Sequence, residues 1–234
     1  LILLLLISRI VSAQTYELII KGGHVIDPAN ALNGVMDVAI SQGRIVKIAP
    51  VLHDEAGKIV RADGLYVTPG FIDMHTHVFV GPRAGLFANG VNSVSPDDFT
   101  FRSGVTTVVD AGTSGWRSFP VFKQQVIDQS KTRILAFVNI AGDGMTGAEH
   151  EQDIGDMNTD SAATVIARYP DIIAGVKIGH FNGKDWTPFE RALQAASRAG
   201  KPLFVECHLP EYALEDQLSR MRAGDIITHT FENI

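Results

Sequence analysis

The chain has 234 residues, of which 45% are hydrophobic and 20% charged, a balance that is typical of a globular protein with a full core. Its formal net charge of −6, with no local cluster of Lys and Arg, argues against a nucleic-acid-binding protein. The single cysteine, Cys207, cannot form an internal disulfide. On a strand between Glu206 and His208 it is expected to be an inert core residue.

The first residues, LILLLLISRIVSAQ, indicate an export signal. The apolar run over 1–7 is too short to span a bilayer, and Val11-Ser12-Ala13 has the small-residue pattern that signal peptidase cleaves. The chain begins at Leu, so the charged start of the signal is expected to be missing. We predict a signal peptide over 1–13, export to the periplasm or beyond, and no stable membrane anchor. A buried first strand in a cytoplasmic protein is the alternative.

Residues 14–68 consist of short β-rich runs: YELIIKGGHVIDP, MDVAISQGRIVKIAP and GKIVRADGLYVTPG. Gly22-Gly23 and Gln42-Gly43 are turn signals between them. This pattern predicts a small all-β domain.

From residue 69 the pattern changes to alternating strands and helices. The strand-like runs are FIDMHTHV, VTTVVDAG, RILAFVNIAG, IIAGVKIG, PLFVECHL and DIITHTF. The helical patterns between them are FPVFKQQVIDQS, SAATVIARY, TPFERALQAASRAG and EYALEDQLSRMRAG. Strands that alternate with helices predict an α/β fold with a parallel sheet, either doubly wound or a (β/α)8 TIM-type barrel.

One of these helices has strong boundary signals. Thr187 and Glu190 have the spacing of a capping box, Pro188 suits the first helical position, and Gly200 suits the end. The pattern predicts a helix that is capped by Thr187, begins at Pro188 and stops before Gly200.

The stretch GFIDMHTHVF alternates polar and apolar residues. On a β-strand Asp73, His75 and His77 would project from the same face. Two imidazoles at this spacing can converge on a single ion, and imidazole suits zinc and its neighbours. A half-buried strand whose polar face meets solvent is the alternative that this stretch alone leaves open.

Further unusual residues lie near the ends of later strand runs: Lys177, His208 and His229. Functional side chains collected from the C-terminal ends of several strands are typical of a barrel, whereas a doubly wound sheet would more often show a Gly-rich phosphate loop after its first strand. The sequence therefore favours the barrel. A whole barrel takes about 250 residues, so with six strand runs before Ile234 we expect an incomplete one, truncated at its C-terminus, over 69–234.

Five motifs occur in a characteristic order: GFIDMHTHV, GVTTVVDAG, GVKIG, ECHLP and THTFENI. In this order they resemble the amidohydrolase superfamily, and within it the dihydroorotase-like and deacetylase-like branch. The resemblance implies that the β-rich region over 14–68 is the N-terminal β-sandwich of that family.

The resemblance also implies a ligand set for two divalent metal ions, most simply Zn²⁺. His75 and His77 would hold the more buried ion, and His208 and His229 the more exposed one. Lys177 would bridge both ions after its amine has been carboxylated to a carbamate, a reaction that requires the neutral amine and hence a lowered pKa. The period of two places Gly175, Lys177 and Gly179 on the same strand face, which leaves room for such an adduct. A surface lysine at a strand end is the alternative.

Other polar residues carry weaker expectations. Asn139 and His180 are candidate substrate contacts. Asp110 is either a loop anchor or a group that supports the metal ligands, and Glu206 either steadies His208 or is a polar residue in the barrel core. His150 is expected to be solvated.

The implied reaction is hydrolysis of non-peptide C–N bonds in a small amide, cyclic amide or N-acyl substrate by a metal-bridging hydroxide. The family's general acid/base, an aspartate at the end of the eighth strand, is expected beyond Ile234. A D-aminoacylase-like deacylase with one tight metal, and a non-catalytic relative that serves as an assembly module, are the alternatives. Assembly into a homo-oligomer is compatible with each of these three interpretations.

Overall fold

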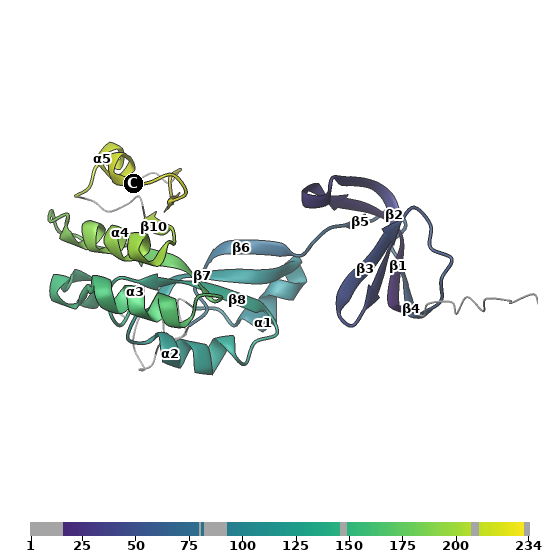
Figure 1. The fold of residues 1–234 in the computed structure, drawn as a ribbon, viewed down its shortest axis with the longest axis horizontal. Coiled ribbons are helices and arrows are strands. Elements are labelled where there is room, and N and C mark those ends of the chain that lie inside the picture. The colour runs from purple at the N-terminus through teal and green to yellow at the C-terminus, as the bar shows by residue number, and fades with distance from the viewer. Residues whose placement is uncertain (1–15, 80, 82–92, 146–148, 207–210, 232–234) are drawn as a thin grey trace, which may run out of the picture. The chain divides into compact units, whose positions relative to one another are not determined.

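We analyse a computed structural model of the chain, in which residues 16–79, 81, 93–145, 149–206 and 211–231 are described. The predicted signal peptide over 1–13, Cys207 and the predicted ligand His208 lie outside the described residues. The chain divides between Pro69 and Gly70 into two compact units, which are described separately below (Figure 1).

The first unit is a single mixed sheet of five strands: β1 (Tyr16–Asp27), β2 (Leu32–Ser41), β3 (Arg44–Ala49), β4 (Ala56–Arg61) and β5 (Tyr66–Val67). The order is β3-β2-β1-β4, and β5 also pairs with β1. β1 and β2, and β2 and β3, are antiparallel, whereas β4 and β5 run parallel to β1. A short 3-10 turn, Pro28–Asn30, joins β1 to β2. That this sheet is one layer of a β-sandwich stays a prediction.

A buried carboxylate holds the loop after β3 to this sheet. Asp37 accepts hydrogen bonds from the backbone N–H groups of Gly22 (2.8 Å) and Leu52 (2.9 Å), and the Lys21 ammonium lies 3.6 Å away. Burial raises the pKa of Asp37, but these hydrogen bonds and the Lys21 charge outweigh it, so the pKa lies below its ordinary value. The small core nearby consists of Tyr16, Ile19, Ala39 and Leu52.

The second unit contains the six predicted strands: β6 (Phe71–Thr76), β7 (Val105–Gly115), β8 (Arg133–Asn139), β9 (Ile173–Ile178), β10 (Leu203–Glu206) and β11 (Ile226–Thr228). They form one parallel sheet in chain order, β6 to β11. The helices are α1 (Pro96–Phe99), α2 (Phe119–Phe122), α3 (Thr159–Arg168), α4 (Thr187–Ala199) and α5 (Leu214–Arg220). Short 3-10 turns lie at Thr100–Ser103, His150–Gln152 and Ile154–Asp156.

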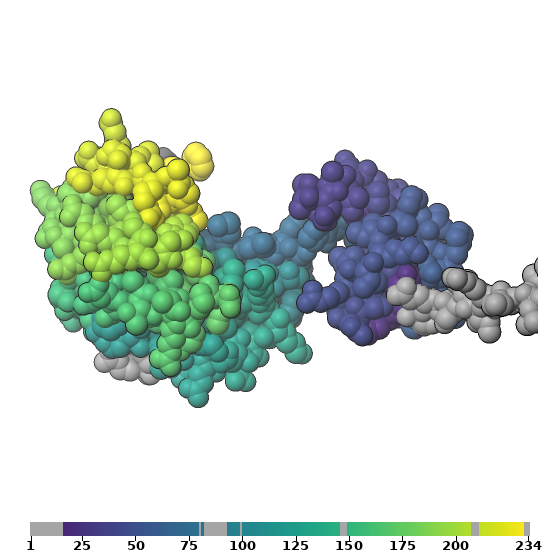
Figure 2. Space-filling model, viewed as in Figure 1, coloured from purple at the N-terminus to yellow at the C-terminus, as the bar shows by residue number. Residues whose placement is uncertain are grey.

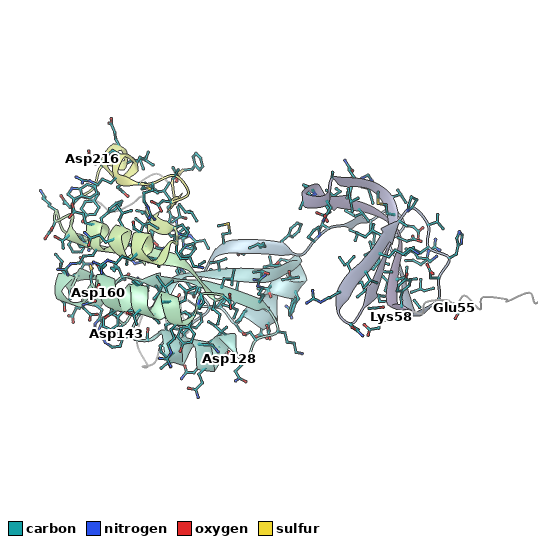
Figure 3. The ribbon with its side chains drawn as sticks, viewed as in Figure 1. Glu55, Lys58, Asp128, Asp143, Asp160 and Asp216 are labelled. Carbon is teal, nitrogen blue, oxygen red and sulfur yellow. The ribbon has the colours of Figure 1, made fainter. Side chains whose placement is uncertain are left out.

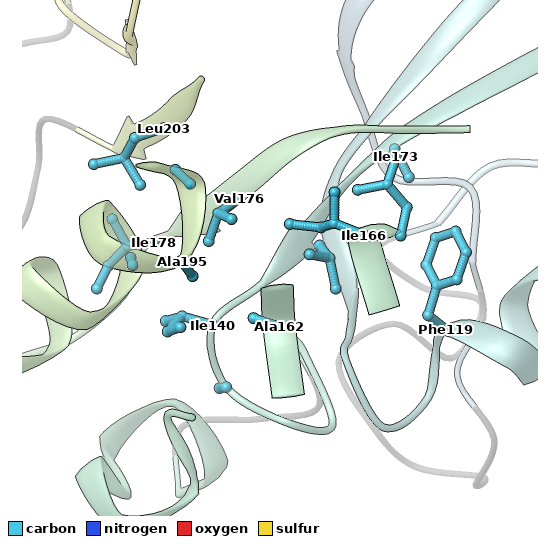
Figure 4. Packing of buried hydrophobic residues seen from close by; sticks show 14 of the residues in the cluster. Phe119, Ile140, Ala162, Ile166, Ile173, Val176, Ile178, Ala195 and Leu203 are labelled. Atoms are coloured by element: carbon cyan, nitrogen blue, oxygen red, sulfur yellow. The ribbon is translucent and has the colours of Figure 1, made fainter. Parts of the chain in front are cut away.

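This curled parallel sheet with helices between its strands has the arrangement of a half-barrel (Figure 1), as the alternation of strands and helices predicts. The larger core lies between the sheet and its helices. It joins strand residues such as Val176 and Leu203 to helix residues such as Ile166 and Ala195 (Figure 4). The smaller core lies among Val109, Ala111, Phe137 and Phe204. The polar site described below borders this smaller core.

The outward sides of α3 and α4 form much of the face of this unit in Figure 2. Acidic side chains such as Asp128 and Asp160 lie at the surface (Figure 3), where they pair with Lys123 and Arg198. Exposed pairs of this kind contribute little to stability. Among the described residues, no helix has the length and apolar character that crossing a membrane requires.

Two helix predictions need correction. The run over 119–130 starts as α2 but continues as a π-helical turn, Lys123–Ile127. The capping box at Thr187 is wrong, because Thr187 is itself the first residue of α4 and Trp186 precedes it as the cap without a side-chain hydrogen bond. The Asp185 carboxylate instead accepts a hydrogen bond from the Thr187 N–H at 2.8 Å. The predicted end is confirmed, since Gly200 adopts the left-handed conformation with φ of 61°.

Candidate metal centre

Three histidine rings gather where β6 and β11 end. The centroid of the His75 ring lies 5.4 Å from that of His77 and 4.9 Å from that of His229, in edge-to-face arrangements. One potential ligand atom from each of His75, His229 and Glu206 can be chosen so that all three lie within 4.8 Å of one another. A single ion can therefore reach side chains from β6, β10 and the end of β11.

The protonation state of His75 and His77 suits metal binding. Burial, together with the nearby Lys177 charge, lowers the pKa of His75 to about 4 and that of His77 to about 3. Both rings are therefore neutral at physiological pH, which is the form in which imidazole ligates a metal.

Threonine hydroxyls hold the Nδ1 atoms of both rings. His75 Nδ1 lies 2.9 Å from Thr228 Oγ1, and His77 Nδ1 lies 2.9 Å from Thr113 Oγ1. Because Nδ1 is engaged in each case, Nε2 is the ring nitrogen that each histidine offers to an ion.

Lys177 on β9 is buried, with only 1% of its surface exposed. Its Nζ donates a hydrogen bond to Glu206 Oε1 at 2.7 Å and lies 4.8 Å from the centroid of the Phe204 ring. Burial lowers the pKa of Lys177, although the Glu206 carboxylate acts in the opposite direction. The alternative of a surface lysine at a strand end is wrong.

Gly112 makes the space that Lys177 occupies. A Cβ atom at Gly112 would lie 2.5 Å from Lys177 Cγ and 2.6 Å from Lys177 Cβ. The backbone there has a φ of +87°, a conformation that side chains of L-residues rarely adopt. Both the turn and the lysine therefore require glycine at this position.

A chain of alternating charges extends from Lys177 toward the loops. Glu206 Oε2 lies 3.0 Å from His180 Nε2, and the Nδ1 atom of the same ring lies 3.1 Å from both carboxylate oxygens of Glu151. Burial lowers the pKa of His180, but the two carboxylates outweigh it and raise the pKa to about 10. His180 is therefore an imidazolium held between two buried carboxylates. Asn139 Nδ2 donates to Glu151 Oε1 at 3.2 Å.

The predicted ligands His75, His77, Lys177 and His229 lie in one neighbourhood, and His208 lies outside the described residues. Of the candidate substrate contacts, His180 reaches the site through Glu206. The Asn139 amide is engaged by protein groups, the Glu151 carboxylate and the Ala141 N–H. A substrate-binding role for either residue stays a prediction.

Two acidic residues have larger roles than the sequence indicates. Glu206 contacts Lys177 directly and lies within reach of the histidines. Glu151 follows His150 in an acidic loop, and nothing in the spacing distinguishes it from its neighbours. It is nevertheless buried against His180. Only the folded loop reveals Glu151, because its partner lies 29 residues later in the chain.

The chain is similar in sequence and fold to proteins named as a deacetylase, a dihydroorotase and an adenine deaminase. A deacetylase of Enterococcus faecalis is 30% identical over 226 residues, which is 92% of this chain and 57% of the relative. The crystal structure of a dihydroorotase superposes with a TM-score of 0.81 at 24% identity, covering 93% of this chain and 58% of that one. An adenine deaminase structure gives 0.77 at 29% identity, covering 94% and 58%.

No protein-family model matches the chain. The chain spans about half the length of the curated relatives it matches, 57% and 47% for the two deacetylases of Enterococcus faecalis and Agrobacterium fabrum.

Proposed function

Because the chain belongs to the amidohydrolase superfamily, we propose that it acts as a metal-dependent hydrolase of non-peptide C–N bonds. The substrate class is a small amide, either a cyclic amide or an N-acyl compound. The named relatives, a deacetylase, a dihydroorotase and an adenine deaminase, support the bond type and differ in the molecule they act on.

One observation carries the proposal, namely the gathering of His75, His77 and His229 beside a buried Lys177. These residues come from strands far apart in the sequence and meet at the C-terminal ends of a parallel sheet, where barrel enzymes bind substrate. The neutral imidazole nitrogens of His75 and His77, and a lysine whose pKa is lowered, fit a divalent transition metal.

His75 and His77 would hold one divalent ion and His229 a second, and a carbamate on Lys177 would be a ligand to both. Zinc is the ion we propose. A divalent ion at such a site polarises a carbonyl and lowers the pKa of water toward neutrality. His208 is proposed as a further ligand on the sequence pattern alone.

The residues around the ligands supply fixed charge. The His180 imidazolium lies between Glu206 and Glu151, so a protonated group with a raised pKa is held at the edge of the site. Glu206 links this imidazolium to Lys177 through a single carboxylate. These two carboxylates balance the charge of the imidazolium and engage both of its ring nitrogens, so the ring is held in one orientation beside the ligands.

Activity on a panel of N-acyl amino acids and cyclic amides, measured with and without zinc and bicarbonate, tests the proposal. We expect hydrolysis of at least one compound, loss on chelation, and recovery on addition of zinc. His75→Ala and His229→Ala should remove the activity, whereas His53→Ala should not, because His53 is exposed in the first unit. Full activity of His75→Ala in the presence of chelator would refute the proposal.

The location of the enzyme is proposed from residues 1–13 alone. If they are an export signal, the mature protein begins at Gln14. Mass spectrometry of the N-terminal peptide from native cells tests this, and a cytoplasmic product that retains these residues would contradict it.

A further inference from the structure

We propose that Asp110 and Thr113 are positioning residues that fix the ring tautomer of His77 and so aim its Nε2 atom at the metal. The inference deepens the proposed function and depends on it for the identity of the ligand. It rests on a hydrogen-bonded relay in which a buried carboxylate, a hydroxyl and an imidazole follow one another.

The direction of each hydrogen bond in the relay follows from the carboxylate. Thr113 Oγ1 lies 2.8 Å from Asp110 Oδ2. Burial raises the pKa of Asp110, but both of its oxygens accept backbone N–H groups, which favours the carboxylate form. A carboxylate can only accept, so the hydroxyl proton points to Asp110. The same hydroxyl oxygen lies 2.9 Å from His77 Nδ1. Because the hydroxyl proton is donated to Asp110, the hydroxyl oxygen accepts a hydrogen bond from the His77 ring. The His77 Nδ1 atom therefore carries the ring proton. Nε2 then has the lone pair that a metal ligand needs.

Asp110 also holds the main chain on both sides of the relay. Its Oδ2 accepts the Val78 N–H at 2.9 Å, directly after His77, and its Oδ1 accepts the Thr113 N–H at 2.7 Å. The carboxylate therefore fixes the backbone that carries the histidine and the backbone that carries its hydroxyl partner.

The carboxylate and the hydroxyl of the relay are enclosed. Asp110 and Thr113 are both 0% exposed, so water does not compete for their hydrogen bonds. The left-handed turn at Gly112 brings the Thr113 hydroxyl back over Asp110 three residues earlier.

The second ligand histidine provides a contrast. His75 Nδ1 also meets a hydroxyl, that of Thr228, but this threonine is only half-buried at the end of β11. The Thr113 relay therefore fixes its histidine through a buried anion, and we expect its loss to have the larger effect on metal binding.

The test compares four forms of the protein: wild type, Thr113→Val, Thr113→Ser and Thr132→Val. Valine keeps the shape of threonine and removes the hydroxyl, whereas serine retains the hydroxyl. Thr132→Val is the matched control, because Thr132 is also buried and its hydroxyl pairs with that of Thr100 (3.0 Å), away from the histidines. The readouts are the ¹⁵N NMR signals of the His77 ring in metal-free protein, assigned by their loss in His77→Ala, and the zinc dissociation constant from competition with a chromophoric chelator.

We expect the Nδ1–H tautomer in wild type and in Thr113→Ser, and a mixture of tautomers in Thr113→Val. Zinc binding should weaken by about 10–100-fold in Thr113→Val, remain near wild type in Thr113→Ser, and not change in Thr132→Val. A wild-type His77 protonated on Nε2 would overturn the inference even if no variant folds, as would a Thr113→Val protein that matches Thr132→Val in both readouts. Failure of wild type to bind zinc would instead count against the proposed function, because the tautomer is measured without metal.

Discussion

Replacing Gly112 by alanine tests how tightly the lysine is held. Two costs follow from the structure. Alanine at a φ of +87° costs about 1–2 kcal/mol in backbone strain. Its methyl group would also lie 2.5–2.6 Å from Lys177 Cγ and Cβ, an overlap of the kind that costs about 1–3 kcal/mol in a packed core. We therefore expect the free energy of unfolding of the second unit to fall by about 2–5 kcal/mol.

Gly200→Ala provides the matched control. Gly200 is also left-handed, with a φ of +61°, but a Cβ atom there would meet nothing within 4 Å. The control therefore carries the strain without the overlap, and the difference between the two variants, about 1–3 kcal/mol, measures the contact with Lys177.

Urea denaturation followed by tryptophan fluorescence suits this comparison, because both tryptophans, Trp116 and Trp186, lie in the second unit. The zinc affinity of the folded variants is the second readout. Gly112→Ala should bind zinc more weakly than Gly200→Ala, since relief of the overlap displaces the lysine. Equal stability and equal zinc affinity of the two variants would refute the assignment of Gly112 as the residue that makes room for Lys177.

Three further predictions concern charged groups. Lys177→Ala should lower the zinc content of the protein, and short carboxylic acids should partly restore activity by replacing the carbamate; zinc analysis and rate assays check this, and undiminished zinc content would contradict it. His180, whose pKa is raised from 6.5 to about 10, should stay protonated at pH 8 in metal-free protein; the stability that its charge provides is complete below pH 6.5 and is lost progressively as the pH rises from 6.5 to about 10, and an NMR titration with a midpoint near 6.5 would contradict this. Asp37, whose pKa is lowered, stabilises the first unit above its ordinary value of 3.8 and loses this effect as the pH falls below it; Asp37→Asn should remove that pH dependence and cost about 1–3 kcal/mol at neutral pH, as NMR of β1 and β2 amides would show.

The parallel sheet and the positions of His75, His77 and Lys177 near its C-terminal edge could be predicted from the sequence because their signals are local. Alternation along GFIDMHTHVF predicts that His75 and His77 project from the same face, and they lie in β6 and directly after it. The short apolar run around Lys177 indicates a buried strand. The C-terminal end of α4 could also be predicted, since Gly200 occupies a left-handed position that favours glycine.

The remaining features depend on partners that meet only in the fold. Thr187 has the right spacing for a capping box, but Asp185 supplies the acceptor and the helix starts one residue earlier than that box would allow. Glu151 is one of several acidic residues in its loop, and it is the turn over His150–Gln152 that places it against His180. Thr113 reads as an ordinary strand residue until the turn at Gly112 brings it onto Asp110.

Anomalous diffraction at the zinc edge, from crystals grown with zinc and bicarbonate, tests the proposed metal centre most directly. We predict a peak about 2.0–2.1 Å from the Nε2 atoms of His75 and His77, with the end of the Lys177 side chain as a further ligand. The absence of a peak among these three side chains, in crystals that bind zinc elsewhere on the chain, would contradict the metal centre and the function proposed from it.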